Sequence, residues 1–131
     1  PEAKQSHALN YAVVRDGEVT LRRTLAQARE GFGNEVPSAG RFPVTPDHRL
    51  FAVFYVQGKD ATGKRVSENR LLEIRPHGEL GKAVRIEFQK PFTSYFTTTV
   101  RAGSAPSNTL DLLGQQAGAS QTISYARVRL R

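Results

Sequence analysis

Residues 101–108 have the composition of a ligand-binding loop, Arg-Ala-Gly-Ser-Ala-Pro-Ser-Asn. The segment supplies a guanidinium from Arg101 and hydroxyls from Ser104 and Ser107, and it follows a predicted strand. Loops carried on rigid strands are where binding groups usually lie. We therefore predict that Arg101 holds a carboxylate or sulfate of a sugar. The alternative is a structural loop whose serines make local turn hydrogen bonds.

Three further residues are candidates for contact with a ligand. Asn69 and Arg70 offer an amide and a guanidinium at the start of a predicted strand, with a purely polar strand entrance as the alternative. Tyr95 has a ring that can stack on a sugar, although the apolar character of its strand favours core packing. The complete set of predicted ligand-binding residues is Arg101, Ser104, Ser107, Asn69, Arg70 and Tyr95.

No motif assigns a reaction. With no cysteine, the chain has no thiolate metal site and no cysteine nucleophile. None of its three histidines has metal-ligand spacing to another, so we expect no metal and no cofactor. Glu68 could act as an acid or base with Glu73 or Asp111, but no spacing argument brings two carboxylates together. Whether the protein is an enzyme is left open.

The charge is strongly positive and unevenly distributed. The 19 Lys and Arg against 12 Asp and Glu give a net charge of +7, and residues 1–35 are neutral. The excess lies in residues 36–131, where arginine predominates. Arginine favours an anionic partner, either an acidic polysaccharide or a nucleic acid, with a merely solvated basic face as the alternative. No run of five basic residues exists, which disfavours nucleic acid.

Most of the chain shows the period of two that is typical of β-strands. Asp16-Gly17 between two such runs predicts a hairpin. A helical turn is expected after Leu25, and loops are expected at 31–40, 57–66 and 114–121. No apolar run is long enough for a membrane-spanning helix. The predicted strands are 8–15, 18–25, 41–45, 50–56, 69–75, 83–88, 92–100, 109–113 and 122–130.

Short sequence similarities suggest an internal repeat. Residues 11–15 and 125–129 share Tyr-Ala-x-Val-Arg, and residues 71–75 keep the branched residue and the Arg. Chance recurrence of β-rich residues is the alternative. The shared order of strands and turns nevertheless favours an all-β chain of antiparallel meanders, about two β-propeller-like blades. The expected repeat units are 8–40, 41–90 and 91–131 within one all-β unit.

On these residues the chain resembles the C-terminal part of a sialidase-like, BNR-type β-propeller of bacterial carbohydrate-active proteins. The resembling stretches are 41–55, the hairpin through Gly78, and 123–128. A strict Asp-box is absent, and the chain contains no Trp. The resemblance implies a carbohydrate-associated role, a secreted or periplasmic location, and binding of an acidic polysaccharide or glycan.

The chain length allows more than one fold and more than one function. The 131 residues are too few for the four blades of the smallest closed propellers. The chain is therefore either a portion of a larger propeller, which would pair with further copies or the remaining blades, or a β-sandwich or jelly roll. The alternative function is a non-catalytic structural or assembly module that pairs through β edges.

Overall fold

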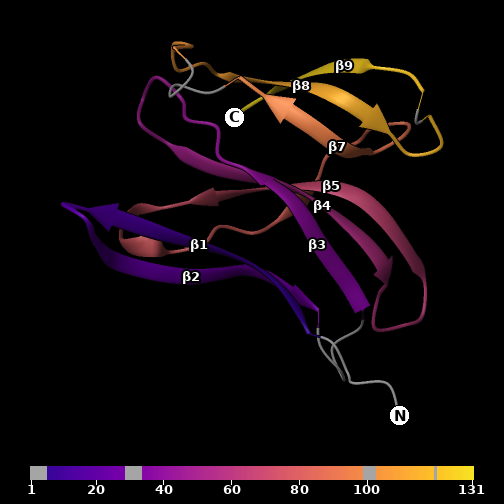
Figure 1. Cartoon of the computed structure of the whole chain (residues 1–131), viewed down its shortest axis with the longest axis horizontal. Coiled ribbons are helices and arrows are strands. Elements are labelled where there is room, and N and C mark those ends of the chain that lie inside the picture. Colours follow the sequence, from indigo (N-terminus) through magenta and orange to yellow (C-terminus); the bar gives the residue numbers. More distant parts are fainter. Residues whose placement is uncertain (1–5, 29–33, 99–102, 120) are drawn as a thin grey trace. The chain divides into compact units, whose positions relative to one another are not determined.

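The computed structural model describes residues 6–28, 34–98, 103–119 and 121–131 (Figure 1). The prediction of an all-β chain is confirmed, because the described residues form three antiparallel sheets and one short 3₁₀ turn, η1 (Pro76–Gly78). The sheet orders are β1-β2, β3-β4-β5-β6 and β7-β8-β9. The strands are β1 (His7–Arg15), β2 (Glu18–Ala28), β3 (Asn34–Arg41), β4 (Leu50–Lys59), β5 (Arg65–Ile74), β6 (Val84–Arg85), β7 (Phe92–Thr97), β8 (Thr109–Gln116) and β9 (Ser124–Arg129).

The hairpin predicted at Asp16-Gly17 is confirmed. Asp16 and Gly17 have φ values of 50° and 80°, which are the positive values that a tight hairpin turn requires. The helical turn expected after Leu25 is wrong, because β2 continues to Ala28, whose Cα partner is His7 at the start of β1. Pairing along the whole of β1 outweighs the helical spacing of the apolar residues in this segment.

The loop expected at 31–40 is also wrong where the structure describes it, because Asn34–Arg41 form β3. Its glycine, proline and serine content is typical of a loop. However, β3 is the edge strand of its sheet, and an edge position tolerates Pro37 because one side of the strand needs no ladder hydrogen bonds. The same composition is therefore compatible with a strand once its place in the sheet is known.

Other element boundaries differ from the expected ones. β4 and β5 extend into the loop expected at 57–66 and leave a tight turn, in which the Thr62 and Lys64 N–H groups donate to Asp60 Oδ1 at 2.9 and 3.0 Å. The strand expected at 83–88 shrinks to β6. The strand expected at 109–113 lengthens to Gln116, within the segment expected as a loop.

The chain divides into two compact units. One consists of Pro1–Ser38 with Val56–Ser67, and the other of Ala39–Tyr55 with Glu68–Arg131. In the second unit, buried side chains from β4 and β5 and from the β7-β8-β9 segment form one hydrophobic core. The members of this core are Phe51, Val53, Tyr55, Leu71, Phe92, Tyr95, Leu110, Leu112 and Leu130.

Two sheets that share one core in this way correspond to a β-sandwich, the expected alternative to the propeller. The described residues form no closed propeller or barrel. Phe92 lies at the centre of the aromatic packing, because its ring makes edge-on contacts with Phe88 and Tyr95 at centroid distances of 5.3 and 6.4 Å. One face of the β7-β8-β9 sheet is therefore packed against this core, and the other face is left for solvent.

Candidate functional site

The β7-β8-β9 sheet carries the candidate site on the face opposite its core. Along β8, Leu110 and Leu112 are buried, whereas Asp111 and Leu113 between and beyond them are accessible to solvent. This alternation is the period of two of a strand with one buried face. We call the solvent side the outer face. Its members are Ser94, Phe96, Thr109, Asp111, Leu113, Gln115, Tyr125, Arg127 and Arg129.

Three large apolar side chains form a row across this face. Phe96 on β7 is the Cα partner of Leu113 on β8, and Leu113 is the partner of Tyr125 on β9. Their exposed fractions are 73%, 50% and 59%. Three adjacent apolar side chains left in water form an exposed patch of the kind that marks interaction sites, unlike singly scattered ones. We call these three residues the apolar row.

A network of polar contacts holds one end of the apolar row. Tyr125 Oη donates to Asp111 Oδ1 at 2.9 Å, and Arg127 Nε donates to the same oxygen at 2.7 Å. The hydrogen bond from Arg127 holds the pKa of Asp111 below its ordinary value, although burial of the carboxyl opposes this effect. Asp111 therefore stays ionised and keeps both Tyr125 and Arg127 in fixed positions.

Arg41, the last residue of β3, lies at the other end of the row. Its guanidinium carbon is 5.9 Å from the centroid of the Phe96 ring. Nη1 donates to the carbonyl of Gly40 at 2.8 Å, and Nη2 donates to the carbonyl of Tyr95 at 3.2 Å. Two main-chain acceptors thus orient the cation beside Phe96, and a guanidinium has five donors in all, so others remain for a ligand.

The structure places the residues of the predicted 101–108 loop as follows. Arg101 lies outside the described residues. Ser104 is partly buried. The Thr109 N–H donates to Ser107 Oγ at 3.1 Å, and Ser107 Oγ lies 2.9 Å from Thr109 Oγ1. Ser107 therefore makes the local turn bonds of the structural alternative, and the small cavity that it lines, about 20 Å³, has room for little more than a water molecule.

The other predicted ligand-binding residues have structural contacts. Asn69 is 0% exposed and Tyr95 is 2% exposed, so the structure places both in the interior rather than on a binding surface. Tyr95 packs in the hydrophobic core, and the buried amide of Asn69 is satisfied by two hydrogen bonds with the main chain of Phe92. Arg70 is paired with Glu68, with Nη2 2.6 Å from Oε1. Asn69, Arg70 and Tyr95 are therefore engaged within the protein, and the outer face is the candidate binding surface that solvent can reach.

The three carboxylates considered for acid and base chemistry each have an arginine partner. Glu68 contacts Arg70, Glu73 contacts Arg49, and Asp111 contacts Arg127. In the part of the chain that the structure describes, no group of three His, Asp or Glu side chains is arranged to hold a metal ion. No helix there is long and apolar enough to cross a membrane.

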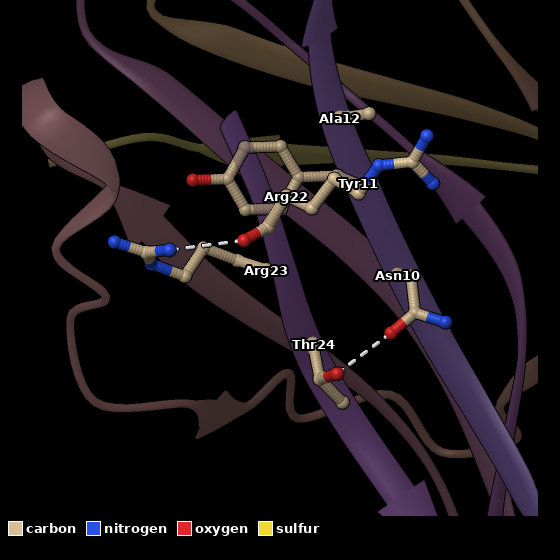
Figure 2. Close-up of a pocket in the computed structure, with 6 residues that line it drawn as sticks. All are labelled: Asn10, Tyr11, Ala12, Arg22, Arg23 and Thr24. Carbon is tan, nitrogen blue, oxygen red and sulfur yellow. Dashed lines mark hydrogen bonds between the residues drawn. The ribbon is translucent and has the colours of Figure 1, made fainter. Parts of the chain in front are cut away.

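A pocket of about 360 Å³ lies on the β1-β2 hairpin, and Figure 2 shows its lining. Thr24 Oγ1 donates to Asn10 Oδ1 at 2.7 Å, and Arg23 Nη1 donates to the carbonyl of Arg22 at 3.0 Å. The one aromatic residue among those that line it, Tyr11, is 8% exposed. This pocket therefore offers cations and polar groups but little aromatic surface.

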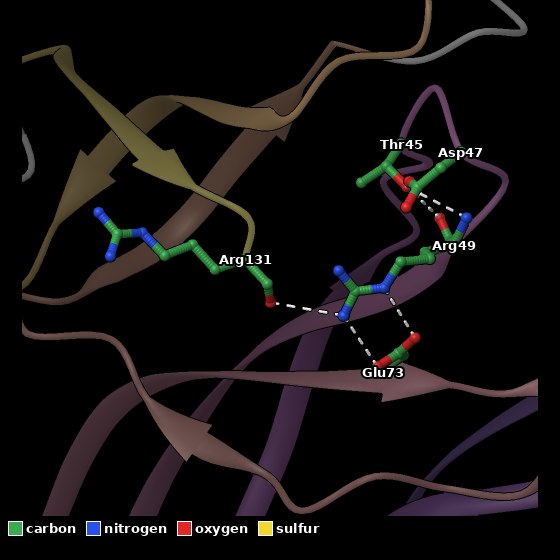
Figure 3. Close-up of polar contacts among 5 residues, drawn as sticks. All are labelled: Thr45, Asp47, Arg49, Glu73 and Arg131. Carbon is green, nitrogen blue, oxygen red and sulfur yellow. Dashed lines mark hydrogen bonds and ion pairs between the residues drawn. The ribbon is translucent and has the colours of Figure 1, made fainter.

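A second pocket, of about 190 Å³, is lined by Arg49 and Glu73. Figure 3 shows the ion pair between these two residues. Arg49 Nε and Nη2 donate to the two carboxylate oxygens of Glu73, each at 3.0 Å. Nη2 also donates to the carbonyl of Arg131 at 3.4 Å, and the guanidinium lies over the Phe51 ring at 4.9 Å. Because Glu73 already neutralises Arg49, this cluster mainly ties β5 to the segment after β9.

The chain matches no family model, no curated protein and no solved structure. The outer face was not among the sequence-predicted sites, although one signal for it existed. Tyr125, Arg127 and Arg129 alternate with Ala126 and Val128 along the last strand.

Proposed function

We propose that the outer face of the β7-β8-β9 sheet binds an acidic polysaccharide, and that the protein is a carbohydrate-associated binding module. The observation that carries this proposal is the apolar row, with an oriented guanidinium at the Phe96 end and a second arginine at the Tyr125 end. Aromatic rings offer flat apolar surface to the C–H groups of a sugar, and arginines form paired hydrogen bonds with carboxylates and sulfates.

The charge around the row supports an anionic polymer. Arg41, Arg127 and Arg129 contribute three positive charges, and Asp111 contributes one negative charge, so this set carries a net charge of +2. An excess of this sign attracts polyanions and raises their rate of encounter. The location that accords with this role is secreted or periplasmic, as the resemblance to carbohydrate-active propellers implies.

Binding to a panel of polysaccharides tests the proposal. Affinity electrophoresis and calorimetry would compare polyuronates, sulfated glycans and neutral glucans at low and moderate salt. Phe96→Ala and Tyr125→Ala are each expected to weaken binding about 10-fold, because each removes exposed aromatic contact surface. Val84→Ala, which truncates another exposed apolar residue of the same unit, is the matched control and should leave binding unchanged.

Two results would refute this function. One is that no acidic polymer binds at low salt. The other is that the row variants bind as tightly as the unmodified chain.

The second candidate function is an assembly module, which the edge positions of β7 and β9 in their sheet favour. In that case the apolar row or a strand edge would be covered by a further copy of the chain or by remaining blades. Light scattering over a range of concentrations separates the two functions. Self-association that Phe96→Ala abolishes supports assembly, and a monomer at all concentrations contradicts it.

A further inference from the structure

The direction of the apolar row restricts the shape of its ligand. Phe96, Leu113 and Tyr125 are successive cross-strand partners, so the row runs across the strands and contributes one side chain from each. Neighbouring strands are about 4.8 Å apart, and the two aromatic residues are therefore separated by roughly 10 Å. These spacings match the rise of one sugar, and the length of one disaccharide, in a flat β-1,4-linked chain.

With this spacing, each sugar of a bound chain would contact one residue of the row, and therefore one strand. In a flat two-fold chain, alternate sugars present the same face, and the sugar between them is turned over. The row has the corresponding order, because two aromatic rings flank one aliphatic side chain. Successive sugars would then lie over Phe96, Leu113 and Tyr125. A helical glycan would not keep alternate sugars in the same orientation over Phe96 and Tyr125.

The two arginines at the ends of the row differ in their remaining capacity for an anion. Arg127 is compensated by Asp111, with its Nε 2.7 Å from Oδ1 and its Nη2 3.4 Å from Oδ2. Arg41 donates only to main-chain carbonyls and has no carboxylate partner among the described residues. Its guanidinium is partly buried and fixed beside the Phe96 ring. An anionic group on the sugar over Phe96 therefore meets an oriented cation that no carboxylate of the described residues neutralises.

We infer that the outer face binds an extended β-1,4-linked uronate chain laid across the three strands, one sugar per strand, with Arg41 holding the carboxylate of the sugar on Phe96. This inference rests on the proposed function and adds the linkage, the direction and the residue that selects for charge. Sulfated helical glycans are the competing ligands that the experiment must exclude.

A series of oligosaccharides tests the length and the shape. Titration calorimetry would use β-1,4-linked uronate oligomers from one to six sugars, with the unmodified chain. Affinity should rise steeply up to the trisaccharide and then change less than threefold, since three sugars cover the row. A plateau at any other length, or tighter binding of a sulfated helical glycan of equal charge, would overturn the inference.

Two arginine variants, one on the outer face and one away from it, test the selectivity for charge. Arg41→Gln should lower the affinity for the uronate trisaccharide roughly 10-fold while leaving a neutral β-1,4-linked trisaccharide nearly unaffected. Arg75→Gln, which removes one exposed positive charge of the same unit away from the outer face, is the matched control and should change the ratio of uronate to neutral affinity by less than threefold. Equal effects of the two variants on this ratio would refute the role of Arg41.

The length series does not depend on any variant, so it decides the inference even if Arg41→Gln fails to fold. Failure of the inference is also distinguishable from failure of the proposed function. If Phe96→Ala weakens polysaccharide binding as expected but the plateau and the Arg41 effect are both missing, only the inference fails. If no acidic polymer binds, both fail.

Discussion

Asn69 and Phe92 are joined by two hydrogen bonds between a buried side chain and the main chain. The Phe92 N–H donates to Asn69 Oδ1 at 2.8 Å, and Asn69 Nδ2 donates to the Phe92 carbonyl at 2.9 Å. The amide of Asn69 thus pairs with Phe92 as the main chain of a neighbouring strand would. This contact pins the first residue of β7 to β5, and it thereby helps to position Phe96 later in the same strand.

Replacing Asn69 should therefore destabilise the fold markedly. Asn69→Ala leaves the buried N–H and carbonyl of Phe92 without their partners, which costs about 2–4 kcal/mol of unfolding free energy. Equilibrium unfolding in urea measures this loss. Asn10→Ala is the control, because Asn10 is exposed and its bond to Thr24 is a surface contact, so the expected loss is below about 1 kcal/mol. Equal losses for the two variants would contradict the role assigned to Asn69.

The main chain of β7 passes so close to Gly114 of β8 that no side chain fits there. A Cβ added there would overlap the carbonyl oxygen of Ser94 and lie 2.5 Å from the Cα of Tyr95. These are main-chain atoms that cannot move aside without breaking the ladder. Gly114→Ala is thus expected to cost more than about 3 kcal/mol or to prevent folding. In Gly81→Ala the nearest atom, the carbonyl oxygen of Glu73, would be 3.3 Å away, so a much smaller loss than for Gly114→Ala is expected for this control.

The pair of Arg49 and Glu73 should make stability depend on pH in the acid range. The hydrogen bond from Arg49 holds the pKa of Glu73 below its ordinary value of 4.5. A depressed pKa means that the stabilisation is fully present above pH 4.5 and is lost as the pH falls through the lower folded-state pKa. Glu73→Gln should therefore show a shallower loss of stability in this range, measured as urea midpoints between about pH 3 and pH 7.

Glu79→Gln provides the comparison at neutral pH. It breaks the ion pair between Glu79 and Arg75. The side chain of Arg75 is 49% exposed and that of Glu79 is 70% exposed, and exposed ion pairs contribute little to the free energy of unfolding. Its midpoint at pH 7 should match that of the unmodified chain. If Glu73→Gln retains the full acid dependence, the pair with Arg49 is not its source.

Tyr95 should behave as a core residue and not as a ligand contact. Its ring is 2% exposed, burial raises the pKa of its hydroxyl, and that hydroxyl has no hydrogen-bond partner among the described residues. Tyr95→Phe should change the unfolding free energy by less than about 1 kcal/mol, whereas Tyr95→Ala should cost about 3–5 kcal/mol. Polysaccharide binding by Tyr95→Phe should equal that of the unmodified chain, and a loss of affinity would show that the ring reaches a ligand.

Local residue patterns alone determined the strand content and several turns. The positive φ values that Asp-Gly adopts readily predicted the first hairpin correctly. The alternation along residues 124–129 also separates the inward Ala126 and Val128 from the outward Tyr125 and Arg127. These features depend on neighbours within a few residues, so they can be predicted without knowledge of the rest of the chain.

The tertiary structure alone decided which aromatic residues of β7 lie inside. Phe92 and Tyr95 are both buried although they are an odd number of positions apart, because a register shift between Phe92 and Ser94 interrupts the alternation. Simple alternation from Phe92 would have placed Phe96, and not Tyr95, in the core. The pairing of Phe96 with Leu113, and of Leu113 with Tyr125, likewise depends on the register between strands that are distant in sequence. The apolar row therefore exists only once the sheet has formed, since its three residues come from three separate segments.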